Sequence, residues 1–180
     1  MGNQHITNKD YQEVLQTCKS IFLKKTTDYG TAWRVLRTIS VIDQIYIKAF
    51  RIRTIQDLKA QKIDDDIAAE FSGIVNYAIV GLIQLNLPNL GPNDIAPNVV
   101  ADMYDKKAEE AFNLMQQKNH DYGEVWRNMS QESFVDLILM KIQRMKQILQ
   151  NNGVTLISEG IDANYHDILN YAMFGLILIK

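Results

Sequence analysis

Residues 118–127 read Lys-Asn-His-Asp-Tyr-Gly-Glu-Val-Trp-Arg, and residues 25–34 read Lys-Thr-Thr-Asp-Tyr-Gly-Thr-Ala-Trp-Arg. Residue 118 corresponds to residue 25, so the copies lie 93 residues apart in a chain of 180. After a slip of one residue, Asn-Tyr-Ala at 76–78 corresponds to Asn-Tyr-Ala at 170–172. Self-similarity at a fixed offset indicates that a structural unit has been duplicated. We therefore expect two similar repeats.

Each repeat contains three stretches whose apolar residues recur at helical spacing, and neither shows the sustained alternation typical of strands. The expected helices cover residues 11–25, 41–58 and about 64–87, then 102–118, 133–149 and about 158–179. Ser40 is the expected N-cap of the second helix, and Gly30 is expected either to end the first helix in a left-handed conformation or to form the turn that redirects the chain. The fold class is therefore all-α: a tandem repeat of a three-helix unit, packed as a pseudo-twofold helical bundle.

The boundary between the repeats is indicated by proline. All three prolines of the chain lie between residues 88 and 97, and proline disrupts a helix interior because it lacks the N–H donor. The sequence predicts a first repeat at residues 1–87, a Pro/Gly linker at 88–100 and a second repeat at 101–180. Because this linker is short and rich in proline, we expect the repeats to form one compact body.

Composition narrows the classes of partner. The net charge is −2 and the basic residues are dispersed, which argues against binding of polymeric nucleic acid or of an anionic membrane surface. The N-terminus lacks a signal-like run, and the apolar run at 172–179 is too short to span a bilayer. We expect a cytoplasmic protein. Cys18 is the single cysteine of the chain, which excludes an intramolecular disulfide. We interpret it as a small buried side chain.

The last expected helix carries a polar stripe beside its apolar face. At about 100° per residue, four polar residues fall within roughly 80°, and a fifth lies about 60° further round. They are Glu159, Asp162, His166 and Asn170, followed by Asp167; the preceding helix adds Asp136, Lys141 and Arg144. Carboxylates at this density favour Mg²⁺, with the basic residues neutralising phosphate oxygens. The alternative is a solvated helix face with interhelical salt bridges, and the spacing leaves both open.

The Asp-Tyr-Gly-x-x-Trp-Arg segment also has two interpretations. In the first, it is a corner between helices, where glycine provides the turn and tryptophan packs. In the second, its side chains contact a nucleotide; the candidates are Lys118, Asp121, Tyr122, Trp126 and Arg127. The first repeat has Ala68 opposite Asp162 and Gly73 opposite Asp167. We therefore expect the complete site in the second repeat and a degraded copy in the first.

The order Lys-x-x-Asp-Tyr-Gly-x-x-Trp, Asp-x-x-x-x-Lys-x-x-Arg and Asn-Tyr-Ala occurs twice. It resembles the nucleotide modification associated domain of type 1, a prokaryotic and phage family, over nearly the whole chain. More distantly, Glu159-x-x-Asp162 is similar to the all-α nucleoside triphosphate pyrophosphohydrolases of the MazG type. That group carries Glu-x-x-Glu on the earlier helix, where this chain has only Asp136. The resemblance implies a nucleotide as ligand and helical carboxylates that hold Mg²⁺.

These patterns predict a nucleotide-binding protein that acts as a Mg²⁺-dependent nucleoside triphosphate pyrophosphohydrolase in nucleotide modification or pool control. The predicted metal ligands are Asp136, Glu159, Asp162 and Asp167, of which the last three also act in catalysis. Lys118, Lys141 and Arg144 are expected to position phosphates, Asn170 to orient a carboxylate or the ligand, and Tyr122 and Trp126 to flank the pocket. The alternatives are a non-catalytic nucleotide-binding or sensor module and a helical protein-interaction module. A homodimer is left open.

Overall fold

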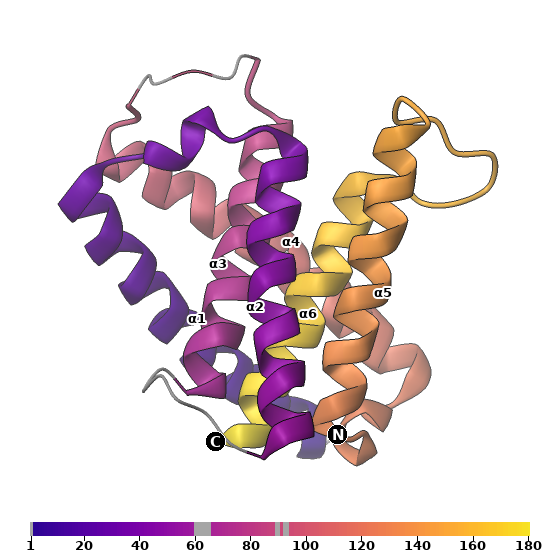
Figure 1. The fold of residues 1–180 in the computed structure, drawn as a ribbon. Coiled ribbons are helices and arrows are strands. Elements are labelled where there is room, and N and C mark those ends of the chain that lie inside the picture. The colour runs from indigo at the N-terminus through magenta and orange to yellow at the C-terminus, as the bar shows by residue number, and fades with distance from the viewer. Residues whose placement is uncertain (1, 60–65, 89–90, 92–93) are drawn as a thin grey trace.

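The computed structural model describes residues 2–59, 66–88, 91 and 94–180. Within these residues the chain is helical and has no strand (Figure 1). The first repeat contains α1 (Gly2–Tyr29), the 3₁₀ helix η1 (Ala32–Val35), α2 (Thr38–Leu58) and α3 (Ile67–Leu85). The second contains α4 (Pro97–Tyr122), η2 (Val125–Asn128), α5 (Gln131–Gln150) and α6 (Ile161–Ile179). The same order of elements in both halves confirms the predicted all-α tandem repeat.

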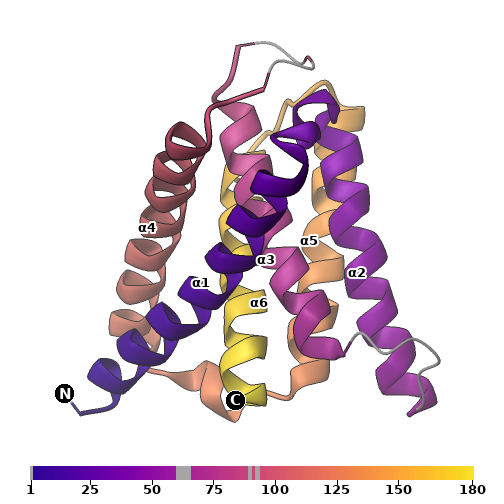
Figure 2. The ribbon, with the colours of Figure 1, turned by 90° about the vertical axis from the view of Figure 1, so that its left-hand side faces the viewer.

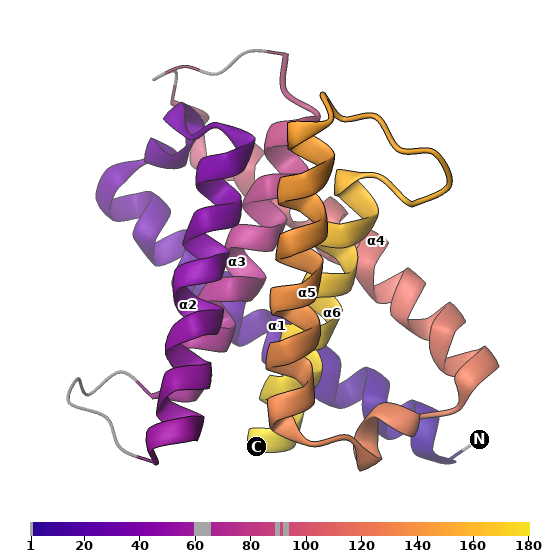
Figure 3. The same ribbon diagram turned by 45° about the vertical axis from the view of Figure 1, so that its right-hand side comes forward.

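The repeats pack about a pseudo-twofold axis. Helices α2, α3, α5 and α6 form the central bundle, and α1 and α4 cross its outer side (Figure 2). Each helix packs against its counterpart: α3 against α6, α2 against α5, which lie side by side in Figure 3, and α1 against α4. In addition, α1 contacts α6 and α4 contacts α3. A twofold arrangement produces this set of contacts, so the bundle reproduces within one chain the geometry of a symmetric dimer.

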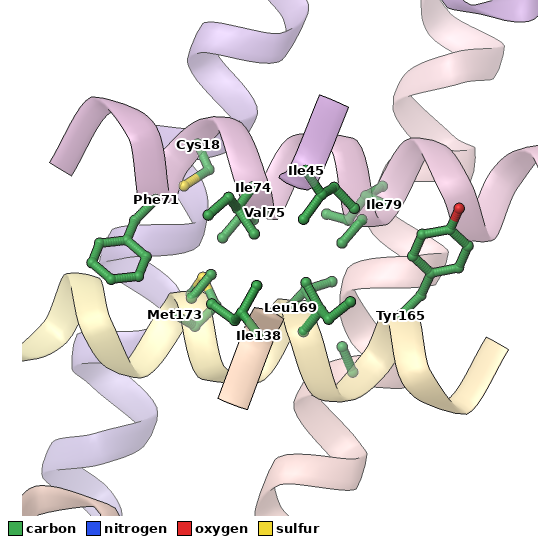
Figure 4. Packing of buried hydrophobic residues seen from close by; sticks show 14 of the residues in the cluster. Cys18, Ile45, Phe71, Ile74, Val75, Ile79, Ile138, Tyr165, Leu169 and Met173 are labelled. Carbon is green, nitrogen blue, oxygen red and sulfur yellow. The ribbon is translucent and has the colours of Figure 1, made fainter. Parts of the chain in front are cut away.

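The central contact, between α3 and α6, depends on two glycines. The ring of Tyr165 from α6 lies against Gly81 of α3, and the ring of Phe71 from α3 lies against Gly175 of α6, where an added Cβ would be 2.8 Å from it. Both rings reach across the contact, with Ile74 and other apolar side chains between them (Figure 4). Because neither glycine has a side chain, each ring can lie close to the opposite backbone.

The repeats also exchange a pair of buried hydrogen bonds. The hydroxyl of Tyr11 on α1 donates to Asn170 Oδ1 on α6 at 2.8 Å, and Tyr104 on α4 donates to Asn76 Oδ1 on α3 at 2.8 Å. The amides of Asn76 and Asn170 donate at 3.1 Å to the backbone carbonyls of Cys18 and of residue 111. Each motif asparagine therefore joins the first helix of its own repeat to that of the other.

Several predicted helix boundaries differ from the observed ones. Gly30 has a φ of +62°, as predicted, but α1 continues to Tyr29. Ser40 is not an N-cap, because α2 begins at Thr38 after the extended residue Arg37. Helix α4 begins at Pro97, within the predicted linker of residues 88–100 and before the predicted helix start at residue 102. Proline fits this position since the first N–H of a helix has no intrahelical partner.

The start of the last helix changes the predicted polar stripe. Helix α6 begins at Ile161 with Gly160 as its N-cap, so Glu159 precedes the helix and does not belong to its face. Glycine favours a helix end over a helix interior because of its backbone entropy. In the first repeat, Asp66 caps α3 by accepting from the N–H of Ala69 at 2.7 Å; the other acidic residues of that run, 64 and 65, lie outside the described residues.

The structure tests the expected burial of Cys18 and shows which described helix has the length and composition of a membrane span. Cys18 is buried in the core, as predicted, and burial raises the pKa of its thiol to about 11. Of the described helices, α3 is the one long and apolar enough to cross a membrane, and 61% of its apolar window is buried. The core helices of soluble proteins meet the same criterion, so this is weak evidence for a membrane span.

Candidate functional site

A cavity of about 600 Å³ opens in the first repeat, between the end of α1, η1, α2 and α3. Its lining includes both basic and aromatic residues of the repeated motif. Among these are Lys25, Tyr29, Trp33, Lys48, Glu70, Gly73, Asn76 and Tyr77. The volume falls within the range of about 300–1,000 Å³ that is typical of small-molecule sites. The sequence motif of the first repeat therefore surrounds a space that could hold a ligand.

The charged residues of this cavity are two lysines and one carboxylate. Glu70 is buried and pairs with Lys48 at 3.3 Å, and it also accepts a hydrogen bond from Arg51 at the edge of the site. Lys25 is exposed at the cavity mouth and makes no ion pair with any residue that the structure describes. The excess of basic groups in the lining favours an anionic ligand.

Three aromatic side chains of the repeated motif line the cavity, beside apolar residues that include Phe22. Tyr29 is 57% exposed, whereas Trp33 and Tyr77 are half-buried. Burial raises the pKa of both phenols, and for Tyr29 the neighbouring Tyr77 adds to the effect. Both hydroxyls therefore keep their protons at neutral pH and can donate hydrogen bonds. The rings offer flat apolar surfaces of the kind on which planar groups stack.

At the equivalent place in the second repeat, an ion-pair cluster replaces the open space. Asp167 on α6 accepts from Lys118 Nζ at 2.6 Å and from Lys141 Nζ at 2.5 Å. Asp167 and Lys141 are 6% and 7% exposed, whereas Lys118 is exposed. Burial acts to raise the pKa of Asp167, but the hydrogen bonds and charges of the two lysines outweigh burial and hold that pKa below its usual range. The carboxylate is therefore ionised and neutralised locally.

The difference between the repeats comes from a carboxylate that has moved by one helical turn. Gly73 stands opposite Asp167, and Glu70, three residues earlier on α3, stands opposite Asn164 on α6. Residues three apart are neighbours along one face of a helix. Lys48 pairs with Glu70 in the first repeat, whereas its counterpart Lys141 pairs with Asp167 in the second.

The four predicted metal ligands do not come together. Asp136 is 64% exposed at its side chain and lies 3.7 Å from Arg53. Glu159 is exposed before α6, and Asp162 is exposed on a separate cavity of about 380 Å³, with Glu110 and His166. Asp162 and Asp167 are five residues apart, which places them about 140° apart around α6. The described residues contain no group of three or more His, Cys, Asp or Glu that could hold a metal. This donor set does not fit one Mg²⁺ site.

Some of the predicted nucleotide-contact residues lie in the corner between α4 and α5, and others lie on the surface. Trp126 is buried and stacks on Phe174 with ring centroids 4.3 Å apart. The guanidinium of Arg127 lies 4.5 Å from the Trp126 ring and donates to Glu124 and to Thr7 Oγ1. These two residues are part of an inter-helix corner, which agrees with the first interpretation of the segment.

The remaining candidates lie apart from that corner. Tyr122 and Asp121 are exposed at the end of α4, and Arg144 is exposed on α5. Asn170 is buried in the hydrogen bonds between the repeats. Among the predicted site residues, the structure brings together Lys118, Lys141 and Asp167 in one cluster, with Glu159 near enough for its charge to act to raise the pKa of Lys118, and Trp126 and Arg127 in another. A ligand contact by any of them stays a prediction.

A family model described as nucleotide modification associated domain 1 matches residues 25–85 and 118–179, more than half of the chain. The chain belongs to the nucleotide modification associated domain 1 family. No curated protein and no solved structure matched. The resemblance to the pyrophosphohydrolases of the MazG type is not shown by these comparisons and stays a prediction.

The two segments of the nucleotide modification associated domain begin at equivalent lysines, Lys25 and Lys118. Sequence reasoning missed the first of them, together with Tyr29, Trp33, Lys48 and Tyr77, because the loss of a carboxylate at Gly73 was interpreted as the loss of a site. The available signal was the basic and aromatic motif itself, which is intact in the first repeat. A glycine in place of an acidic residue also removes a side chain, and at Gly73 the end of Lys48 lies where that side chain would begin.

Proposed function

We propose that the protein binds a nucleotide in the cavity of the first repeat. The observation that carries this proposal is the lining: two lysines and three aromatic residues of the family motif surround a space of about 600 Å³. A nucleotide combines an anionic phosphate with a planar base, and the lining offers a complementary group for each. The family description, which refers to nucleotide modification, agrees with this class of ligand.

Lys25 and Lys48 are the groups that would bind phosphate oxygens, since charge-assisted hydrogen bonds are stronger than neutral ones. The base would pack against Trp33, Tyr29 or Tyr77, and stacking on an aromatic side chain contributes about 1–3 kcal/mol per base. Asn76 lines the cavity but is already bound to Cys18 and Tyr104. Its role in this proposal is to fix α3 against α1 and α4 and so to maintain the cavity.

Binding without hydrolysis is the function that the geometry supports best. Hydrolysis with Mg²⁺ was predicted on four carboxylates, and the arrangement of these residues does not provide one metal site. We therefore assign no catalytic step to them. A nucleotide sensor or carrier needs only the cavity.

The proposal is tested by calorimetric titration of the purified protein with nucleoside triphosphates, monophosphates and the parent nucleosides, with and without Mg²⁺. We expect at least one nucleotide to bind, and Lys25→Ala to weaken its binding about tenfold, the effect of one lost charged hydrogen bond. Lys24→Ala is the matched control, because Lys24 is equally exposed but lies outside the cavity lining. No binding by any member of the panel, or equal losses in the two variants, would contradict the proposal.

A further inference from the structure

The second repeat shows how this scaffold holds an anion. The carboxylate of Asp167 lies between two ammonium groups, 2.6 Å from that of Lys118 on α4 and 2.5 Å from that of Lys141 on α5. Three helices contribute to this contact, and the site is largely closed to solvent on the side of Lys141. Two lysines on separate helices therefore converge on one negative group.

The first repeat has the same two lysines but no carboxylate at the position of Asp167. Lys25 and Lys48 are the counterparts of Lys118 and Lys141, and Gly73 is the counterpart of Asp167. All three line the same cavity. A Cβ added at Gly73 would lie 2.6 Å from Lys48 Cε and 3.0 Å from Lys48 Nζ. The end of the Lys48 side chain thus occupies the place where a side chain at residue 73 would begin.

Glu70 does not replace the missing carboxylate completely. It pairs with Lys48 at 3.3 Å, longer than either contact of Asp167, and it is shared with Arg51. Lys25 has no acidic partner among the described residues. The lysine pair of the first repeat therefore keeps the capacity to bind a further anion, whereas the pair in the second repeat is satisfied.

We infer that the first repeat binds a phosphate group of its ligand between Lys25 and Lys48, above Gly73, and that Asp167 is the built-in equivalent of this phosphate in the second repeat. The inference rests on the proposed function in that the anion belongs to a nucleotide. It adds the position of the phosphate and identifies Gly73 as the residue that lacks a competing carboxylate. It also explains why a ligand would occupy one repeat.

The first test introduces the missing carboxylate. Gly73→Asp should place an internal anion between Lys25 and Lys48, so the affinity for a nucleotide should fall by about tenfold or more. The affinity for the corresponding nucleoside should change much less. Gly73→Asn is the matched control, because it adds the same volume without charge and should keep more of the preference for nucleotide over nucleoside. Equal losses for Gly73→Asp and Gly73→Asn, or no loss in either, would overturn the inference.

The second test empties the built-in site and does not depend on nucleotide binding. Asp167→Gly should make the protein bind inorganic phosphate or formate between Lys118 and Lys141, which is measured as an anion-dependent rise in melting temperature beyond that of the wild type. Asp167→Asn keeps the volume filled and should show no such rise. If Asp167→Gly is unfolded in dilute buffer, recovery of helical circular dichroism on adding phosphate is the readout, against sodium chloride at equal ionic strength.

The two proposals can fail separately. Rescue of Asp167→Gly by phosphate, with no nucleotide bound by the wild type, would support the anion role of the lysine pair and contradict the proposed function. Nucleotide binding that is equally strong in wild type and Gly73→Asp would support the proposed function and contradict the phosphate position. Absence of rescue in Asp167→Gly, by both readouts, would also contradict the inference.

Discussion

The two repeats use the same pair of lysines in different ways. In the second repeat Lys118 and Lys141 neutralise Asp167, which pairs with both of them. In the first repeat the acidic residue lies one turn earlier, at Glu70, and the lysines line a cavity. The backbone framework is common to both, because the central helices pack about a pseudo-twofold axis. The difference indicates that the position of one carboxylate determines whether the lysine pair is neutralised by an acidic side chain or lines a cavity.

The largest expected effect concerns the ion-pair cluster of Asp167, Lys118 and Lys141 in the second repeat. Asp167→Ala removes the only acidic partner of Lys141 in the described structure and leaves its buried ammonium uncompensated. Breaking a buried pair in this way costs about 3–5 kcal/mol. Urea unfolding should therefore show a lower free energy of unfolding by roughly this amount. Asp136→Ala, which removes an exposed partner of Arg53, should change it by at most about 1 kcal/mol. Similar values for both variants would mean that the cluster does not stabilise the second repeat.

The next prediction tests whether the contact between α3 and α6 is symmetric, although the lysine pairs of the two repeats have different surroundings. Gly81→Ala and Gly175→Ala each place a methyl group against an aromatic ring of the opposite helix. Overpacking of this kind costs about 1–3 kcal/mol, and both substitutions should lower the melting temperature to a similar degree. Gly91→Ala is the control, since nothing lies within 4 Å of its added Cβ. A loss confined to one of the two core glycines would show that the pseudo-twofold packing is unequal.

A smaller effect is expected from the exchanged hydrogen bonds. Tyr11→Phe and Tyr104→Phe each remove a hydroxyl that donates to an asparagine at 2.8 Å. A hydrogen bond of this type contributes about 1 kcal/mol, and the two substitutions should be equivalent in chemical denaturation. Tyr122→Phe provides a control because that ring is 75% exposed. Unequal effects would indicate that one repeat depends on the other more than the reverse.

The last prediction concerns the pH dependence of stability, which is expected to change little near neutral pH. The folded-state pKa of Asp167 is lowered, so its contribution to stability is present above the ordinary value of 3.8 and is lost as pH falls through the lower folded value. The pKa of Lys118 is raised by Asp167 despite the opposing effect of burial, so its contribution is present below 10.5 and is lost as pH rises through the folded value. Asp167→Asn should flatten both limbs of the stability profile. Unchanged limbs in that variant would assign the pH dependence to other groups.

Much of the fold followed from the sequence because repetition and periodicity are local signals. The offset between the two Asp-Tyr-Gly segments and the helical spacing of apolar residues fixed the number and order of the helices in each repeat. Gly30 was identified correctly because only a residue without a side chain adopts its conformation easily. The predicted helix ends were less accurate: Glu159 was placed in the last helix, but it precedes that helix. The residue types found at a helix end also occur in the adjoining turn, so the sequence does not separate the two.

The candidate site was harder to predict because it depends on which helices face one another. The prediction assigned Asp162 and Asp167 of one helix to the same metal site, but packing reveals that one lies near Glu110 and the other near Lys118 and Lys141. Periodicity also cannot show an unfilled space. Gly73 lines the cavity of the first repeat with Lys48 against it, whereas the sequence shows only that an acidic residue is missing at this position.

The hydrogen bond between Tyr11 and Asn170 has a consequence for how the chain folds. Its partners are separated by 159 residues, whereas most contacts in helical proteins are local. Folding rates fall as the average sequence separation of native contacts rises, because more chain entropy is lost before those contacts form. We expect folding slower than is usual for a helical bundle of this length. During synthesis, the part of the apolar face of α3 that packs against α6 has no partner until α6 has left the ribosome.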